Sequence, residues 1–172
     1  GRRLRFTAQV FADCTGDGTI GYLAGADYRL GREAKSETDE ERAEDKADTM
    51  TMGTSIMWYA VDGEEDFPVT PWAAQFNSKS CQKTLKGDWN WETGMMHHQV
   101  DEFEYVRDYG MRVVFGNWSF QKNDPELKQK YAGKKLGWVA YIGGKRESRR
   151  LMGDVILRQQ DVVDFVEFPD AC

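Results

Sequence analysis

The chain has 172 residues, of which 40% are hydrophobic and 30% charged, a composition typical of a folded globular protein. Its formal net charge of −6 argues against DNA or RNA as a partner, because nucleic-acid binding requires a basic surface. No stretch approaches the roughly 20 apolar residues that a membrane-spanning helix needs, so no membrane partner is expected. Aromatic residues make up 13% and predict either a broad packed core or a ligand cleft.

The first quarter of the chain predicts a strand, a glycine turn and a short helix. Apolar and polar side chains alternate over residues 4–12, as they do in a strand. The polar sequence Thr15, Gly16, Asp17 and Gly18 follows and predicts a tight turn. Ile20, Leu23 and Ala24 then recur at helical spacing, and Gly25 ends the helix.

The middle of the chain alternates between charged and apolar stretches. Residues 33–48 are strongly charged and predict a solvated loop or an exposed helix. Residues 49–61 are rich in β-formers and methionine and predict a strand that is buried on at least one side. Pro68 and Pro71 interrupt any regular element after it.

The second half contains the clearest helix. Residues 100–118 place apolar side chains on one stripe and charged ones elsewhere. Residues 136–142 predict a strand on which Trp138, Ala140 and Ile142 face one way. The fold class expected is α+β, with a mixed or antiparallel sheet and one prominent helix.

The turn at residues 15–18 suits ligand binding, because glycines let a backbone approach a ligand closely. Its surroundings resemble a family of FAD-dependent oxidoreductases. The residues that carry this resemblance are 10–18, 23–26 and 28–33, with a second family signature at 146–153 and Asp161 beyond it. Some bacterial members of this family carry the name xanthan lyase. The resemblance implies FAD as cofactor, contacted by the turn, and hydride transfer from an organic or sugar-like substrate whose identity it does not give.

The sequence departs from the family pattern in one important respect. The G-x-G-x-x-G motif with which the family begins, and which binds the pyrophosphate of a dinucleotide, does not occur before the turn at residues 15–18. We therefore expect an internal fragment of a two-domain flavoprotein that binds FAD poorly alone. Residues 1–32 are expected to form the edge of the FAD domain and residues 33–172 the substrate-side domain, unless 146–172 rejoin the FAD domain. The intact protein is expected to be an enzyme.

Candidate catalytic residues are few. Arg146 and Arg149 can pair with an anionic substrate or a reduced flavin, although Glu147 can instead pair with Arg149 or Arg150 in a structural network. His97 and His98 are the two histidines, and acid–base chemistry is conceivable for them. They are more often polar residues before a helix, and the sequence predicts no metal site.

A second hypothesis is a carbohydrate-active protein, either a polysaccharide lyase or a sugar-binding module. Trp89 and Trp91 have the i, i+2 spacing that places two side chains on one strand face, where sugars stack. Core packing is the other interpretation of these tryptophans. A third possibility is a structural module without activity.

The three cysteines, Cys14, Cys81 and Cys172, are odd in number and far apart, so small buried or terminal thiols are expected. They favour a reducing compartment. Localisation stays open between cytoplasm and export, and so does the oligomeric state.

Overall fold

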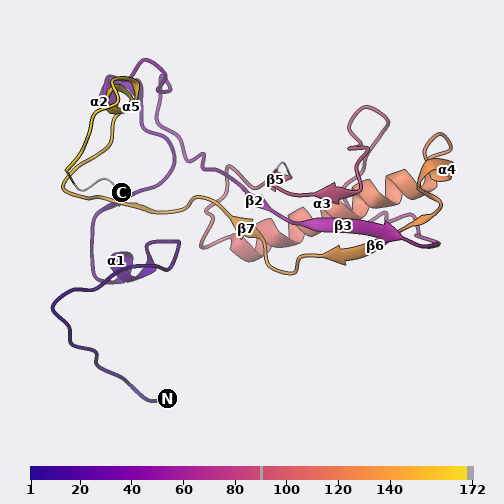
Figure 1. Cartoon of the computed structure of the whole chain (residues 1–172), viewed down its shortest axis with the longest axis horizontal. Helices are drawn as coiled ribbons and strands as arrows, with labels where there is room; N and C mark the ends of the chain where they lie inside the picture. Colours follow the sequence, from indigo (N-terminus) through magenta and orange to yellow (C-terminus); the bar gives the residue numbers. More distant parts are fainter. Residues whose placement is uncertain (90, 170–172) are drawn as a thin grey trace.

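The computed structural model describes residues 1–89 and 91–169 and confirms an α+β fold with antiparallel sheets and one main helix. Figure 1 shows two parts side by side. Residues 1–49 and 146–169, at the two ends of the chain, lie together in what we call the terminal lobe. Residues 50–145 form the central unit, which contains the long helix and the longest strands.

The central unit is built on helix α3, which spans Phe103–Asn123. Its buried side chains include Val106, Val114 and Trp118, so the predicted apolar stripe is confirmed. The helix continues past the predicted end at 118 and stops before Pro125, which cannot continue a helix. The short helix α4, Lys128–Tyr131, follows and packs Tyr131 against Trp118.

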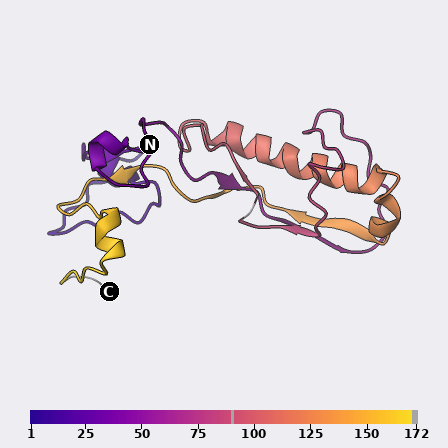
Figure 2. The same ribbon diagram turned by 90° about the horizontal axis from the view of Figure 1, so that it is seen from above.

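Two three-stranded antiparallel sheets complete the central unit. In the larger one, β3 (Trp58–Asp62) lies between β4 (Lys86–Gly87) and β6 (Lys134–Val139). In the smaller one, β2 (Thr54–Ser55) lies between β5 (Glu92–Thr93) and β7 (Gly144–Lys145). Figure 2 shows α3 over one face of these strands. The segment predicted as one strand at 49–61 is therefore two strands, and its burial is confirmed at Ile56 and Trp58.

The core lies between α3 and the strands. Trp58 packs edge-on against Trp91 and Trp118 at centroid distances of 5.4 and 5.9 Å, and it is 1% exposed. Glu65 ties the two layers together, because Oε2 accepts from Nε1 of Trp118 and from the backbone N–H of Leu136, both at 3.0 Å. The core of the central unit is therefore built largely from packed aromatic side chains, which join α3 to the strands.

The opposite face of β3 and β6 is open. Tyr59 and Trp138 stack there at 5.8 Å, and each is 46% exposed. The predicted alternation of Trp138, Ala140 and Ile142 is therefore wrong, since Ala140 is buried and Ile142 exposed. The strand ends at Val139, so the period-two pattern does not extend to the later residues.

The terminal lobe has little regular structure. It contains α1 (Thr19–Leu23), α2 (Lys35–Thr38), α5 (Gln159–Val163) and a two-stranded ribbon of β1 (Tyr28–Arg29) with β8 (Arg150–Leu151). The predicted short helix near residue 20 and the exposed charged segment are confirmed. Among the described residues, Ala34 is the one buried hydrophobic residue of the terminal lobe.

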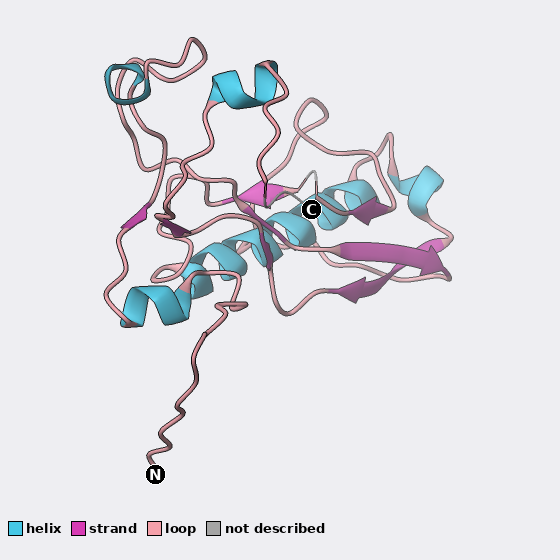
Figure 3. Ribbon diagram, turned by 60° about the vertical axis from the view of Figure 1, so that its left-hand side comes forward, coloured by secondary structure: helices cyan, strands magenta, loops and turns pink. Residues whose placement is uncertain are grey.

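The strand predicted at residues 4–12 is wrong. This segment pairs with no other strand in the described part of the chain, and Figure 3 shows it as a loop that runs away from the rest. Leu4, Phe6 and Val10 are at least 74% exposed. Alternation alone does not make a strand, because the backbone also needs a hydrogen-bonded neighbour.

The cysteine prediction holds in part. Cys81 is buried, and its burial raises the pKa of its thiol. Cys14 is exposed, contrary to expectation, while Cys172 lies outside the described residues. No helix among the described residues is long and apolar enough to cross a membrane.

Candidate functional site

The two segments that resemble the flavoprotein signatures meet in space at Asp17. Its Oδ2 accepts from Nζ of Lys145 and its Oδ1 from Oγ of Ser148, both at 2.7 Å. These partners lie 128 and 131 positions further along the chain. Asp17 therefore joins the glycine turn of residues 15–18 to the segment that leads into β8.

These contacts stabilise the ionised form of the Asp17 carboxylate. Partial burial opposes ionisation, but the hydrogen bonds from Lys145 and Ser148 and the charges of Lys145 and Arg149 outweigh it. The pKa of Asp17 consequently lies below its ordinary value. The Asp17 and Lys145 side chains are 21% and 20% exposed, so this ion pair is better shielded than a fully exposed one.

Asp13 shapes the turn from the inside. Its Oδ2 accepts from the backbone N–H of Gly21 at 2.9 Å, and its Oδ1 from the N–H and hydroxyl of Thr15 at 3.0 and 2.7 Å. The Gly21 hydrogen bond, followed by those from Thr15, lowers the pKa of Asp13 to about 2. The carboxylate thus fixes both ends of the turn.

The outer side of the turn keeps donors available. Gly16 and Gly18 have φ values of 80° and 60°, the left-handed region that glycine adopts without strain. The backbone N–H groups of Gly16, Asp17 and Gly18 donate to no other group in the described part of the chain. Successive unpaired N–H groups in a turn can donate to anionic oxygens.

Arg149 places a cation beside these donors. Its guanidinium carbon lies 4.0 Å from the ring centroid of Tyr22 and 6.0 Å from that of Tyr28. Its Nη1 donates to the backbone oxygen of Asp17 at 3.4 Å, while Nε is buried without a hydrogen-bond partner within the described residues. Arg149 therefore retains donor capacity next to the turn.

The other arginines of the segment are engaged in ion pairs. Arg146 pairs with Glu92, and Arg150 pairs with Glu33 and with Glu147. The predicted local pair of Glu147 with a nearby arginine is confirmed for Arg150. A cavity of about 570 Å³ borders Arg150 between residues 36–40 and 151–158. Asp161 caps α5 by accepting from the Arg158 N–H at 2.9 Å.

The two histidines belong to the start of α3. The Nδ1 of His97 donates to Glu102 Oε1 at 3.1 Å, and the backbone N–H of His98 donates to Glu102 Oε2 at 2.7 Å. The His98 hydrogen bond, followed by that of His97, lowers the pKa of Glu102. Neither histidine contacts the turn, and no cluster of metal-ligating side chains exists among the described residues.

The tryptophan pair does not form a platform. Trp91 is 8% exposed and packs in the core, whereas Trp89 is 52% exposed. The two side chains are therefore not presented together, and the carbohydrate hypothesis finds no support in their arrangement.

Sequence reasoning missed Lys145, Ser148 and Asp13. An Asp two residues before Thr15 is a signal for a side chain that caps its own turn, and that signal was available in the sequence. Nothing in the local pattern distinguished Lys145 or Ser148, because their roles depend on a contact across more than a hundred residues.

Comparison with known proteins agrees with the joined signatures. The family model described as FAD dependent oxidoreductase matches residues 1–172, the whole chain. The chain belongs to this family of FAD-dependent oxidoreductases. No curated protein and no solved structure shows significant similarity to it.

Proposed function

We propose that the protein transfers a hydride from an organic substrate to FAD, and that the glycine turn and Arg149 contact the cofactor. Family membership supports the cofactor and the class of reaction. The observation that carries the proposed site is the set of unpaired N–H groups of the turn, fixed by Asp17 beside the Arg149 guanidinium.

The residues of the turn fit one part of such a cofactor. The N–H groups of Gly16 and Gly18 can donate to phosphate oxygens, and Arg149 can neutralise their charge. Gly16, Gly18 and Gly21 have the spacing of the dinucleotide motif G-x-G-x-x-G, but the helix that follows has only 5 residues, so we assign the turn to one edge of a cofactor site. Flavin supplies the hydride-accepting chemistry, and the protein supplies binding and orientation.

Asp17 acts in this proposal as a positioning residue. Both of its oxygens already accept a hydrogen bond, and each bond ties the turn to the segment that carries Arg149. We further propose that residues 1–32, together with the returning segment from 146, form the cofactor side of the protein, and that the substrate lies toward the central unit.

The first test is the visible absorbance of the purified protein as its gene encodes it. Flavin bands that survive gel filtration, and a flavin reduced by a substrate in the absence of oxygen, are expected. A protein that carries no flavin and cannot be reconstituted with FAD would contradict the proposed function.

The second test separates the two candidate arginines. Arg149→Gln is expected to weaken FAD binding about tenfold, because it removes a cation with free donors beside the turn. Arg146→Gln, whose side chain is engaged by Glu92, serves as the matched control and should leave FAD affinity unchanged. Flavin fluorescence titration measures both. Equal losses in the two variants would remove the specific role of Arg149.

A further inference from the structure

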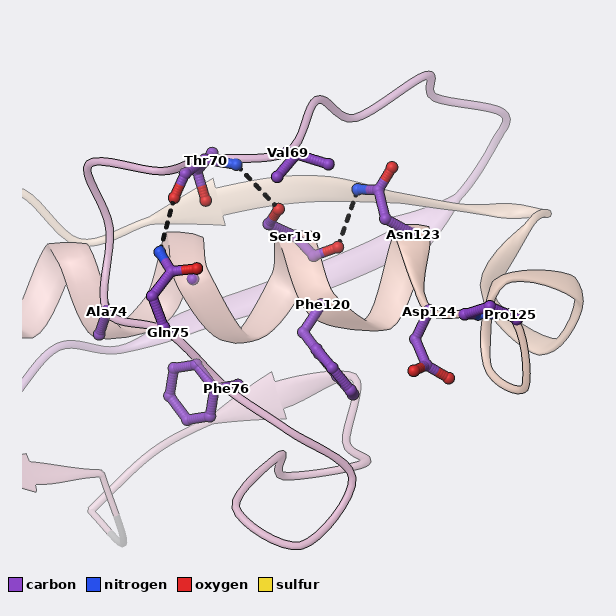
Figure 4. Close-up of a pocket in the computed structure, with 11 residues that line it drawn as sticks. Val69, Thr70, Ala74, Gln75, Phe76, Ser119, Phe120, Asn123, Asp124 and Pro125 are labelled. Carbon is purple, nitrogen blue, oxygen red and sulfur yellow. Dashed lines mark hydrogen bonds between the residues drawn. The ribbon is translucent and has the colours of Figure 1, made fainter.

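A cavity of about 270 Å³ lies between α3 and the loop of residues 69–76, in the central unit. Figure 4 shows Thr70 and Gln75 on one side of it with the ring of Phe76 beside Gln75, the ring of Phe120 in the middle, and Asn123 and Asp124 on the far side of Phe120. The volume is at the lower limit of ligand pockets and suits a molecule with a single ring.

Thr70 presents an unpaired hydroxyl to this cavity. The residue is 4% exposed, and its Oγ1 has no hydrogen-bond partner within the described residues. The rest of Thr70 is engaged, since its N–H donates to Oγ of Ser119 at 3.2 Å and its carbonyl accepts from Nε2 of Gln75 at 3.1 Å. A buried hydroxyl without a partner costs about 1–3 kcal/mol, so a ligand that pairs with it recovers that cost.

The donors around the cavity are already used. Nε2 of Gln75 also donates to the carbonyl of Ala73 at 2.8 Å, and Nδ2 of Asn123 donates to the carbonyls of Phe67 and Ser119 at 3.0 and 2.9 Å. These carbonyl partners fix which amide atom is nitrogen. The hydroxyl of Ser119 donates to the carbonyl of Pro68 at 2.9 Å.

The polar atoms that remain free in the lining of the cavity are mainly hydrogen-bond acceptors. The amide oxygens of Gln75 and Asn123 receive no hydrogen bond from the described residues. Asp124 is the one charged side chain among the lining residues, and Oδ1 of its carboxylate accepts from the Glu126 N–H at 3.0 Å. An anionic ligand would meet a carboxylate and no cation there.

We propose that this cavity binds a small primary ammonium ion that carries an aromatic or other apolar group. The ammonium group has three N–H donors and no acceptor, which matches a site whose free polar atoms are mainly acceptors. The rings of Phe76 and Phe120 contribute apolar contact and attract a cation through their faces. Asp124, on the far side of Phe120 in Figure 4, adds a negative charge to the lining at longer range.

Three probes of similar shape test the chemistry by isothermal titration calorimetry at neutral pH. Benzylammonium is expected to bind saturably, benzyl alcohol at least about tenfold more weakly, and benzoate not at all, because they differ in charge and in the number of donors. Absence of saturable benzylammonium binding, or benzoate binding of equal strength, would overturn the proposal.

Two variants locate the binding. Thr70→Val removes the hydroxyl at nearly constant shape, and Asp124→Asn removes the charge while keeping Oδ1. Thr70→Val is expected to weaken benzylammonium binding about tenfold, and Asp124→Asn by a smaller factor, because its carboxylate acts at longer range. Thr7→Val, the same chemical change in an exposed segment, is the control and should bind normally.

Thermal unfolding shows whether a variant binds weakly because it has lost its fold. Thr70→Val should keep or raise the melting temperature, because the hydroxyl that it removes has no partner. Weakened binding in a protein of unchanged stability supports the site. Unchanged affinity in both Thr70→Val and Asp124→Asn would place the binding elsewhere and refute the proposal.

Discussion

Asp17 is one carboxylate that holds together two signatures separated by more than a hundred residues. Asp17→Asn is expected to lower the free energy of unfolding by about 1–3 kcal/mol, because it replaces charge-assisted hydrogen bonds in a partly buried site with weaker ones. Urea unfolding measures the loss. Asp66→Asn, at an exposed position, is the control, and an equal effect there would show that Asp17 has no special role.

The same carboxylate predicts how stability depends on pH. Its pKa is lower in the folded protein than in the unfolded chain, so its contribution is fully present above the ordinary Asp value of about 3.9. That contribution is lost as the pH falls through the lowered folded pKa. The difference in unfolding free energy between the wild type and Asp17→Asn should therefore be constant near neutrality and shrink in acid. A difference that grew on acidification would contradict this assignment.

Individual residues show what a sequence can and cannot reveal about the site. The tight turn at residues 15–18 was predicted from its glycines, and Gly16 and Gly18 have left-handed φ values in the structure. A pairing of Glu147 with Arg149 or Arg150 was predicted because they belong to the same element, and the structure shows the pair with Arg150. The ion pair of Asp17 with Lys145 was not predicted, since no periodicity connects positions 128 residues apart. The alternation predicted from Trp138 to Ile142 likewise failed, because it depends on where β6 ends.

Helix α3 is the element on which the central unit depends, and its glycines mark close approaches. A Cβ at Gly116 would lie against the backbone carbonyl of Ala74, well inside van der Waals contact. A glycine costs a helix interior up to about 1 kcal/mol, so packing is the reason for its presence here.

Gly116→Ala should therefore destabilise the protein by at least about 2 kcal/mol, despite the better helix propensity of alanine. Gly133→Ala is the matched control, because a Cβ there meets nothing within 4 Å. Thermal and urea unfolding compare the two. A neutral Gly116→Ala would mean that the loop of residues 69–76 does not press against α3.

Elements were predictable where a periodic pattern and a packing partner coincide. The stripe of α3 was predicted correctly because one face of the helix meets the strands. The strand at residues 4–12 was predicted from the same kind of pattern, yet it lacks a pairing partner among the described residues. Periodicity identifies a surface that can be buried, and the chain as a whole decides whether it is.

At the scale of the whole molecule, burial is unevenly distributed. Eleven of the twelve buried hydrophobic residues named for the described chain lie between Ile56 and Ala140, and Ala34 is the exception. Large apolar side chains are exposed throughout the terminal lobe, including Leu23, Leu157 and Phe165. The terminal lobe is thus held by polar contacts at Asp17 and Arg150 more than by a core of its own.

Hydrogen exchange is expected to follow this division. Peptides from α3 and β3 should be protected near the level set by global unfolding, and peptides from residues 1–30 and 151–169 should exchange through local opening at much lower cost. Mass spectrometry of exchanged protein measures both. Uniform protection across the chain would contradict the polar attachment of the terminal lobe, and added FAD that protects residues 15–18 would support the proposed site.

The antiparallel pairing of β2 with β7 has a consequence for how such a protein can change over time. Thr54 lies opposite Lys145, so the chain enters and leaves the central unit at hydrogen-bonded neighbours. Whatever is inserted between those points begins and ends at nearly the same place. The central unit can therefore vary in length and sequence between related proteins, or be exchanged by a protein engineer. The spacing between the two segments of the terminal lobe that flank it would stay the same.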